Sequence, residues 1–91
     1  MTRVRDIIDV WSVQTPRDLR MAVIAEVADR HGVPVEEVMG GRREKIIARA
    51  RQDSMAAIKA RFPNDTLPMI GRLFNRDHTT VLHALRKQAV R

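Results

Sequence analysis

The 91-residue sequence predicts a small all-α domain that contains a helix-turn-helix. Of its residues 44% are hydrophobic but only 3% are aromatic, and such an aliphatic composition suits a modest core of packed helices. Apolar residues recur at the helical period of about 3.6 in several segments. Near the C-terminus only two residues separate two such segments, and so short a link makes two helices cross steeply.

The first expected element is an amphipathic helix within residues 1–14, ahead of a main domain at residues 15–91. Its apolar stripe consists of Val4, Ile7, Ile8 and Trp11. Two roles are open for this helix. It either covers the core of the domain itself, or it forms a surface for self-association or for a partner, such as a replication or transcription protein.

Two scaffold helices are expected next. The first begins at the capping residue Thr15, has Pro16 at its first position and stops at Gly32, an arrangement typical of helix ends. Its apolar residues are Leu19, Val23 and Val27. The second helix is short and is ended by two consecutive glycines. Its apolar residues are Val33, Val35, Val38 and Met39.

Charge is distributed unevenly along the chain, whose net charge is +6. Residues 1–41 hold 5 basic and 7 acidic side chains, whereas residues 42–61 hold 7 basic and 2 acidic ones. Residues 72–91 add 5 basic and 1 acidic side chain. A basic half beside an acidic half is typical of a polyanion-binding face, although charges that merely solvate a helix surface are the alternative.

The predicted helix-turn-helix occupies the C-terminal third. Its first helix covers residues 66–74, with Thr66 as the cap, a proline in the first turn and apolar residues at positions 67, 70, 73 and 74. Asn75 and Arg76 form the link, and we expect Asn75 to take the left-handed conformation that glycine often supplies. Asp77 stands where the second helix needs its N-cap.

The second helix of this pair combines a polar tip with a separate apolar stripe. Short hydrogen-bonding side chains fill its first turn, and its stripe follows at Val81, Leu82 and Leu85. A polar tip in front of a core-facing stripe is typical of a helix that reads DNA. A capped surface helix with ordinary threonines is the alternative.

Three blocks carry a family resemblance: GRREKIIARARQ at residues 41–52 with SMA at 54–56, LPMIG at 67–71 and RDHTTVLHA at 76–84. In order and nearly in spacing, they resemble the C-terminal DNA-binding domain of the bacterial replication initiator DnaA. The resemblance covers about residues 22–87. It implies a Trp-repressor-like helical fold that binds double-stranded DNA at the nine-base-pair DnaA box or a related A/T-rich site, and thereby regulates replication initiation or transcription.

By position, the resemblance implies that Arg43, in a basic loop, enters the minor groove and that Asp77, His78 and Thr79 read the major groove. The implied phosphate contacts are Arg51, Gln52, Thr66, Leu67, Thr80 and His83, with Lys59 near the groove. The residue types suit these roles. A guanidinium fits the narrow, electronegative minor groove of A/T-rich DNA, a carboxylate accepts from cytosine N4, and a threonine methyl packs on a thymine methyl.

The sequence departs from the family pattern at several places. Asn75 alone stands where the family has two glycines, and the loop at residues 62–65 is correspondingly one residue longer. Ala50 replaces a proline, which lets the following helix begin earlier, and Glu44 adds a negative charge to the basic loop. We therefore expect the same mode of binding with an altered preference among DNA sites.

Enzymatic and cofactor chemistry find little support. The four glycines form no phosphate-binding loop, so we expect no nucleotide and no ATP-driven melting of an origin. His78 and His83 project about 140° apart on a helix and the chain has no cysteine, so we expect no metal site. Ser12 and Ser54 have no base that the sequence reveals. We expect neither an enzyme nor a cofactor.

Two classes of function remain. Without a signal peptide or a long apolar stretch, the sequence predicts a cytoplasmic, nucleoid-associated protein with no membrane contact. In the first class it is a sequence-specific reader of DnaA-box-like sites. In the second it is a weakly specific nucleoid-associated protein or an interaction module. The intact set of Arg43, Asp77, His78 and Thr79 favours the first class.

Overall fold

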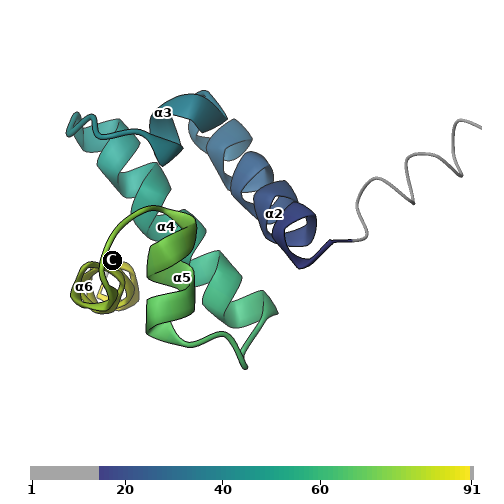
Figure 1. Ribbon diagram of the computed structural model, residues 1–91. Coiled ribbons are helices and arrows are strands. Elements are labelled where there is room, and N and C mark those ends of the chain that lie inside the picture. Colours follow the sequence, from purple (N-terminus) through teal and green to yellow (C-terminus); the bar gives the residue numbers. More distant parts are fainter. Residues whose placement is uncertain (1–14, 91) are drawn as a thin grey trace, which may run out of the picture.

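A computed structural model describes residues 15–90, and within them it shows five helices and no strand (Figure 1). The helices are α2 (Pro16–His31), α3 (Val35–Met39), α4 (Lys45–Arg61), α5 (Leu67–Leu73) and α6 (His78–Ala89). The all-α prediction is confirmed. The helix expected within residues 1–14 lies outside the described residues, so both of its suggested roles, and the boundary at residue 15, stay predictions.

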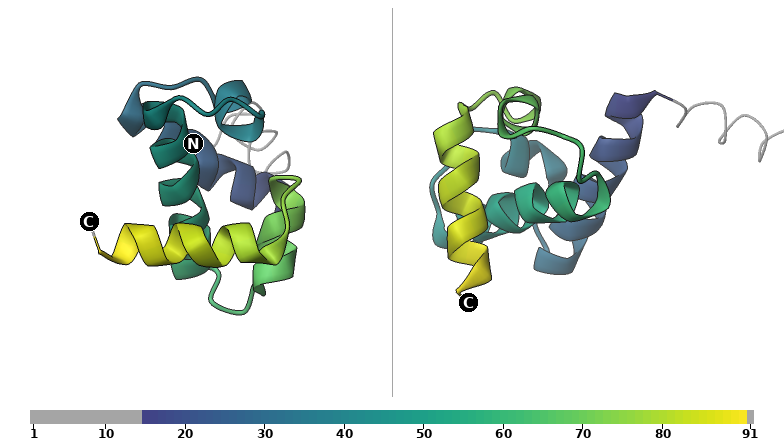
Figure 2. Two further views of the ribbon diagram at one scale, coloured as in Figure 1. Left: turned by 90° about the vertical axis from the view of Figure 1, so that its left-hand side faces the viewer. Right: turned by 90° about the horizontal axis from the view of Figure 1, so that it is seen from below.

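Helix α4 is the centre of the fold, because it contacts each of the other four helices. Helices α2 and α3 pack on one side of it, and α5 and α6 form the helix-turn-helix on the other (Figures 1 and 2). Helix α4 begins at Lys45, five residues before Ala50, so that alanine lies inside a regular helix. The basic segment of the sequence therefore sits between the scaffold and the helix-turn-helix.

Local capping sets the limits of α2 as the sequence predicts. The Thr15 side chain accepts a hydrogen bond from the Asp18 backbone N–H at 3.0 Å, and Gly32 ends the helix with a φ of 67°. The apolar residues of α2 are not all buried. Leu19 is 42% exposed, whereas burial begins at Val23, because the first turn of α2 lies beyond the part of the helix that the core covers.

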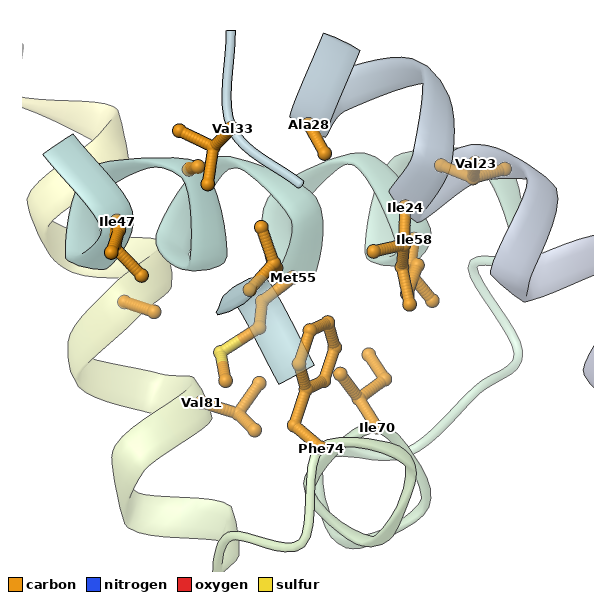
Figure 3. Packing of buried hydrophobic residues seen from close by; sticks show 13 residues of the cluster. Val23, Ile24, Ala28, Val33, Ile47, Met55, Ile58, Ile70, Phe74 and Val81 are labelled. Atoms are coloured by element: carbon orange, nitrogen blue, oxygen red, sulfur yellow. The ribbon is translucent and has the colours of Figure 1, made fainter. Parts of the chain in front are cut away.

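The core lies on both sides of α4. On one side α2, α3 and the link between them contribute Val23, Ile24, Ala28, Val33 and Val38, and on the other side the core lies where α4 meets the helix-turn-helix. Figure 3 shows Phe74 and Val81 pointing toward Met55 of α4, with Ile70 beside Phe74, and each of these four side chains is at most 1% exposed. On α6 the fully covered positions are Val81 and Ala84, while Leu82 and Leu85 are only partly buried. The predicted stripe was thus right about Val81 and wrong in counting Leu82 among its core positions.

The turn between α5 and α6 depends on Gly71 and Asn75. Asn75 adopts the predicted left-handed conformation, with a φ of 57°. The Gly71 carbonyl accepts a hydrogen bond from the Arg76 N–H at 2.8 Å. A Cβ at Gly71 would lie 2.5 Å from the Arg76 carbonyl oxygen, which is closer than real Cβ atoms come. The absence of a side chain therefore lets α6 begin directly against α5, and the two helices cross steeply (Figure 2).

The loop at residues 62–65 is held by a buried aspartate. Arg20 of α2 donates two hydrogen bonds to the Asp65 carboxylate, at 2.9 and 2.7 Å, and its guanidinium lies 3.8 Å from the centroid of the Phe62 ring. Hydrogen bonding from Arg20 lowers the pKa of Asp65. The longer loop thus has a defined path, and it delivers the chain to Thr66 at the start of α5.

Candidate nucleic-acid interface

The tip of α6 is organised by the Asp77 carboxylate. Its Oδ1 atom accepts hydrogen bonds from the backbone N–H groups of Thr79, at 2.9 Å, and Thr80, at 3.3 Å, and from the Thr79 hydroxyl. This confirms the predicted N-cap. The Thr79 hydroxyl, followed by the two backbone N–H groups, lowers the pKa of Asp77. The tip therefore carries an ionised carboxylate, and none of these three bonds involves its Oδ2 atom.

The polar side chains around this cap face solvent. His78, Thr79, Thr80 and His83 are all exposed, and they lie in the first two turns of α6. The other face of the same helix is anchored by Val81, which is fully buried. Because one face is fixed to the core, the exposed tip is presented in a single orientation, as a helix that enters a groove of DNA requires.

The basic loop, which we define as residues 40–44, joins α3 to α4. Arg42 forms ion pairs with Glu37 at 3.3 Å and with Glu44 at 3.0 Å. The negative charge of Glu44 is therefore offset within the loop itself. Arg43 is exposed and takes no part in the ion pairs of residues 15–90, so its guanidinium is available to an outside anion.

Arg51 holds the basic loop from inside the protein. It is only 8% exposed, and its Nε atom donates to the Val38 carbonyl at 2.8 Å. Its Nη2 atom donates to the carbonyls of Glu37, Gly40 and Arg42 at 3.1 to 3.2 Å. The residue predicted as a phosphate contact is thus mainly occupied with backbone carbonyls, and Nη1 is the one nitrogen that these four bonds do not use.

A second arginine reaches the same loop from the helix-turn-helix. Arg76 donates from Nη2 to the Gly40 carbonyl and from Nη1 to the Phe74 carbonyl, both at 2.8 Å. Burial first, and then the nearby charge of Arg76, lower the pKa of Arg51. A guanidinium nevertheless stays charged near neutral pH, so the two arginines concentrate positive charge beside the loop.

Two shallow hollows connect the loop to α6. One, of about 220 Å³, lies between α4 and α6 and is lined by Arg51, Gln52, Thr80 and His83 together with Arg76 and Lys87. The other, of about 550 Å³, is lined by Arg43, Lys45 and Arg49 and shares Ala48, Gln52 and Lys87 with the first. The shared lining makes one continuous basic surface that runs from Arg43 to Thr80 and His83.

The structure thus brings most of the predicted site residues together but not all of them. Thr66 caps α5, because its hydroxyl accepts from the Met69 N–H at 3.3 Å, and Leu67 follows it. Lys59 donates to the Pro63 and Asp65 carbonyls at 2.9 and 2.8 Å, so it stabilises the loop that precedes Thr66. These three residues form a separate group, at the start of α5.

Four basic residues of this surface were not among the predicted site residues: Lys45, Arg49, Arg76 and Lys87. Lys45 and Arg49 belong to the basic segment at residues 42–61, whose excess of charge the sequence shows. Lys87 lies four residues after His83 and seven after Thr80, so helical spacing alone places it on their face. That signal was present and could have been used. Arg76 was treated only as part of the turn, and its bond to Gly40 spans 36 positions, a contact that no local pattern reveals.

Other kinds of site find no support in the described part of the chain. Between residues 15 and 90, no three His, Asp or Glu side chains are grouped so that they could hold a metal ion. Within the same residues, no helix has the length and apolar character that crossing a membrane requires. The basic surface is therefore the candidate functional site of the described residues.

Comparison with known proteins shows which family the chain is similar to. A family model described as the bacterial dnaA protein helix-turn-helix matches residues 20–87. The chromosomal replication initiator protein DnaA of Rhizobium johnstonii is 43% identical over 74 residues, which cover 79% of this chain and 15% of that protein. The same-named protein of Mesorhizobium japonicum is 40% identical over 80 residues, covering 86% of this chain and 16% of that protein.

A more distant organism gives a similar result. The chromosomal replication initiator protein DnaA of Thermus thermophilus is 41% identical over 76 residues, which cover 79% of this chain and 17% of that protein. The chain thus spans about one sixth of the length of the curated relatives that it matches. The matched part includes α3 to α5, the basic loop and most of α6.

Proposed function

The chain belongs to the family of bacterial DnaA helix-turn-helix domains, a DNA-binding family of replication initiation, and we propose that it binds double-stranded DNA sequence-specifically at DnaA-box-like sites. One observation carries the proposal. One continuous basic surface runs from the exposed Arg43 to Thr80, and the backbone N–H of Thr80 is bonded to the carboxylate of Asp77, which caps the exposed helix tip. A surface of this kind suits a duplex read in two grooves at once.

In the major groove, the tip of α6 supplies the base contacts. Oδ1 of Asp77 is used for capping, and its Oδ2 accepts a hydrogen bond from cytosine N4. The Thr79 hydroxyl is held by Asp77, so the methyl group of Thr79 is the part offered to a thymine methyl. His78, exposed beside them, completes the reading set.

In the minor groove, Arg43 supplies the contact. An exposed guanidinium without an ion pair among the described residues enters the narrow groove of A/T-rich DNA, where the electrostatic potential is most negative. Arg42 is engaged by Glu37 and Glu44, and so it is the weaker candidate of the two. Pairing between Arg42 and Glu44 also leaves the charge of Arg43 uncompensated.

Phosphate contacts set the register of the protein on the duplex. Gln52, Thr80 and His83 line the hollow between α4 and α6, and Arg51 reaches a phosphate there through Nη1. Thr66 and Leu67, at the start of α5, contact the sugar-phosphate backbone of the DNA. Lys59 uses two of the three N–H bonds of its ammonium group on carbonyls, which leaves one for a phosphate.

By occupying such sites without ATPase activity, the protein regulates replication initiation or transcription. The match covers only 15 to 17% of each relative, and no activity of their remaining length enters this proposal. Contact with a replication or transcription protein through residues 1–14, a cytoplasmic location and the lack of a nucleotide ligand stay predictions. Weakly specific binding in the nucleoid, or a role as an interaction module, is the alternative.

Fluorescence anisotropy separates these possibilities. Labelled duplexes that contain one DnaA box, or the same bases in permuted order, are titrated with the full chain at two salt concentrations. We expect tighter binding to the box, by about tenfold or more at the higher salt, and a steep loss of affinity on both duplexes as salt rises. Equal affinities would favour weakly specific binding in the nucleoid. No binding at low salt would exclude both modes of DNA binding and leave the interaction module.

A further inference from the structure

Two arginines from different helical elements meet at a single carbonyl group. Arg51 of α4 and Arg76 of the α5–α6 turn both donate to the Gly40 carbonyl oxygen, at 3.1 and 2.8 Å. We propose that this pair is an arginine clamp: Arg51 fixes the shape of the basic loop, and Arg76 is a positioning residue that fixes the loop relative to α6. The proposal rests on the proposed function, because it concerns how two DNA contacts act together.

Arg51 sets the shape of the loop because it binds the end of α3 and the first half of the loop together. Its four hydrogen bonds reach carbonyls of residues 37, 38, 40 and 42, which include the last part of α3 and the loop itself. A buried guanidinium has five N–H donors in a rigid plane, so these carbonyls are held in one arrangement. Removing Arg51 would leave several of them without that partner, and the loop would lose its fixed path.

Arg76 carries the position of α6 to that loop. Its backbone N–H is bonded to the Gly71 carbonyl, and its own carbonyl packs where a Gly71 side chain would otherwise lie. The next residue is the N-cap Asp77. Because its backbone is fixed at the start of α6 and its Nη2 atom at Gly40, Arg76 sets the distance between the reading helix and the loop that bears Arg43.

The consequence is that Arg43 and the tip of α6 meet DNA as one unit. With the clamp in place, a base sequence suited to α6 places Arg43 over one particular stretch of minor groove. Without the clamp, Arg43 must be ordered again on every encounter, and the entropy of that ordering opposes binding. The protein then no longer prefers DNA sites in which the bases read by α6 and the minor groove entered by Arg43 lie at one fixed spacing.

A simpler role for Arg76 is a direct phosphate contact, since it lines the hollow between α4 and α6. A double-mutant cycle distinguishes the two roles. Arg43→Ala is measured in the natural chain and in Arg76→Ala, on a duplex containing one DnaA box. A clamp makes the two losses strongly non-additive, whereas two independent contacts give additive losses.

We expect Arg43→Ala to reduce affinity about tenfold in the natural chain and no more than about twofold in Arg76→Ala, a coupling of about 1 kcal/mol. The matched control is the cycle of Arg43→Ala with Arg72→Ala, which removes an exposed arginine of α5. That control cycle should be additive. Equal losses from Arg43→Ala in both backgrounds of the Arg76 cycle would overturn the clamp.

A readout without DNA tests the clamp independently. The ¹⁵N heteronuclear NOE of the amides of residues 41–44 should fall in Arg76→Ala but not in Arg72→Ala, with the melting curve used to confirm that each variant is folded. Arg76→Gln serves the same purpose should Arg76→Ala unfold. An unchanged loop NOE in a folded Arg76 variant would overturn the proposal even if the natural chain binds its site.

The conservative variant Arg76→Lys completes the test. A lysine keeps the charge but cannot donate to the Gly40 and Phe74 carbonyls in the fixed geometry of a guanidinium. We expect it to recover less than half of the coupling with Arg43. If Arg76→Lys binds with full affinity and its losses with Arg43→Ala are additive, Arg76 is a plain phosphate contact and the clamp is overturned.

The failure of the proposed function is distinguishable from the failure of the clamp. If the natural chain shows no preference for the box, the proposed function fails, and the loop NOE still decides whether the clamp exists.

Discussion

Nη2 of Arg76 lies 2.8 Å from the carbonyl oxygen of Gly40, although 36 positions separate the two residues in the sequence. This hydrogen bond joins the turn of the helix-turn-helix to the loop before α4. Two elements that sequence patterns treat as separate DNA contacts are therefore mechanically connected.

The Thr79 methyl and hydroxyl groups have different tasks, and Thr79→Ser separates them. Serine keeps the hydroxyl that bonds Asp77 but loses the methyl proposed to meet a thymine. We expect Thr79→Ser to leave the melting temperature nearly unchanged and to cost about 1 to 3 kcal/mol of discrimination at one thymine. Titration on duplexes with single thymine-to-uracil replacements identifies the thymine that Thr79 contacts, because uracil lacks the methyl group.

Gln52→Ala provides the comparison for base reading. Gln52 lies in the hollow proposed to hold a phosphate, and a phosphate contact carries no base information directly. We expect its loss to weaken binding to box and permuted duplexes by the same factor. A loss confined to the box duplex would mean that Gln52 reads a base.

Asp77 acts both as a helix cap and as a proposed base reader, and two substitutions divide these roles. Asparagine is as good an N-cap as aspartate, whereas alanine is a poor one. We expect Asp77→Asn to keep the melting temperature near that of the natural chain but to lose the preference for cytosine, and Asp77→Ala to lose both. Thermal melts and duplexes with single cytosine replacements measure the two effects. An unchanged base preference in Asp77→Asn would exclude Asp77 as a reader.

Gly71 should tolerate no side chain, because its Cβ would lie 2.5 Å from a backbone oxygen. We expect Gly71→Ala to lower the free energy of unfolding by about 1 to 3 kcal/mol, since α5 and α6 must move apart. Gly41→Ala is the matched control, because nothing lies within 4 Å of the corresponding position. Urea unfolding of both variants checks this. Equal stabilities would mean that the turn relaxes at no cost.

The bond between Arg20 and Asp65 should make stability depend on pH in acid. Hydrogen bonding from Arg20 lowers the pKa of Asp65 from its ordinary value of 3.8. The ionised carboxylate therefore contributes stability above that ordinary value, and the contribution is lost as pH falls through the lower pKa of the folded state. We expect Asp65→Asn to be less stable than the natural chain at neutral pH.

The stability difference between the natural chain and Asp65→Asn should then narrow as pH falls below about 4. Urea unfolding at a series of pH values measures it. A constant difference across the acid range would show that Asp65 acts through packing alone.

What local patterns could establish is clear from the helix ends. The caps Thr15, Thr66 and Asp77 form the predicted hydrogen bonds, and Asn75 takes the predicted left-handed turn. Each of these features depends on residues within a few positions of one another. Sequence reasoning therefore located the helix-turn-helix and its exposed tip without knowing the packing.

What local patterns could not establish depends on distant contacts. Helical periodicity gives a face but not the neighbour that covers it, so Leu82 was placed on the core-facing stripe although it is only partly buried. An arginine in a basic segment suggests a surface charge, yet Arg51 is buried among carbonyls that α3 and the basic loop supply. Its depth follows only from the way these two segments fold onto α4.

Simultaneous reading of two grooves is tested most directly by dimethyl sulfate footprinting on a duplex containing one DnaA box. This reagent methylates guanine N7 in the major groove and adenine N3 in the minor groove. We expect protection of both kinds of atom at adjacent positions within one site. Arg43→Ala should remove the adenine protection and leave the guanine protection in place. Weak, even protection along the whole duplex, or protection in one groove alone, would contradict joint reading by the basic loop and α6.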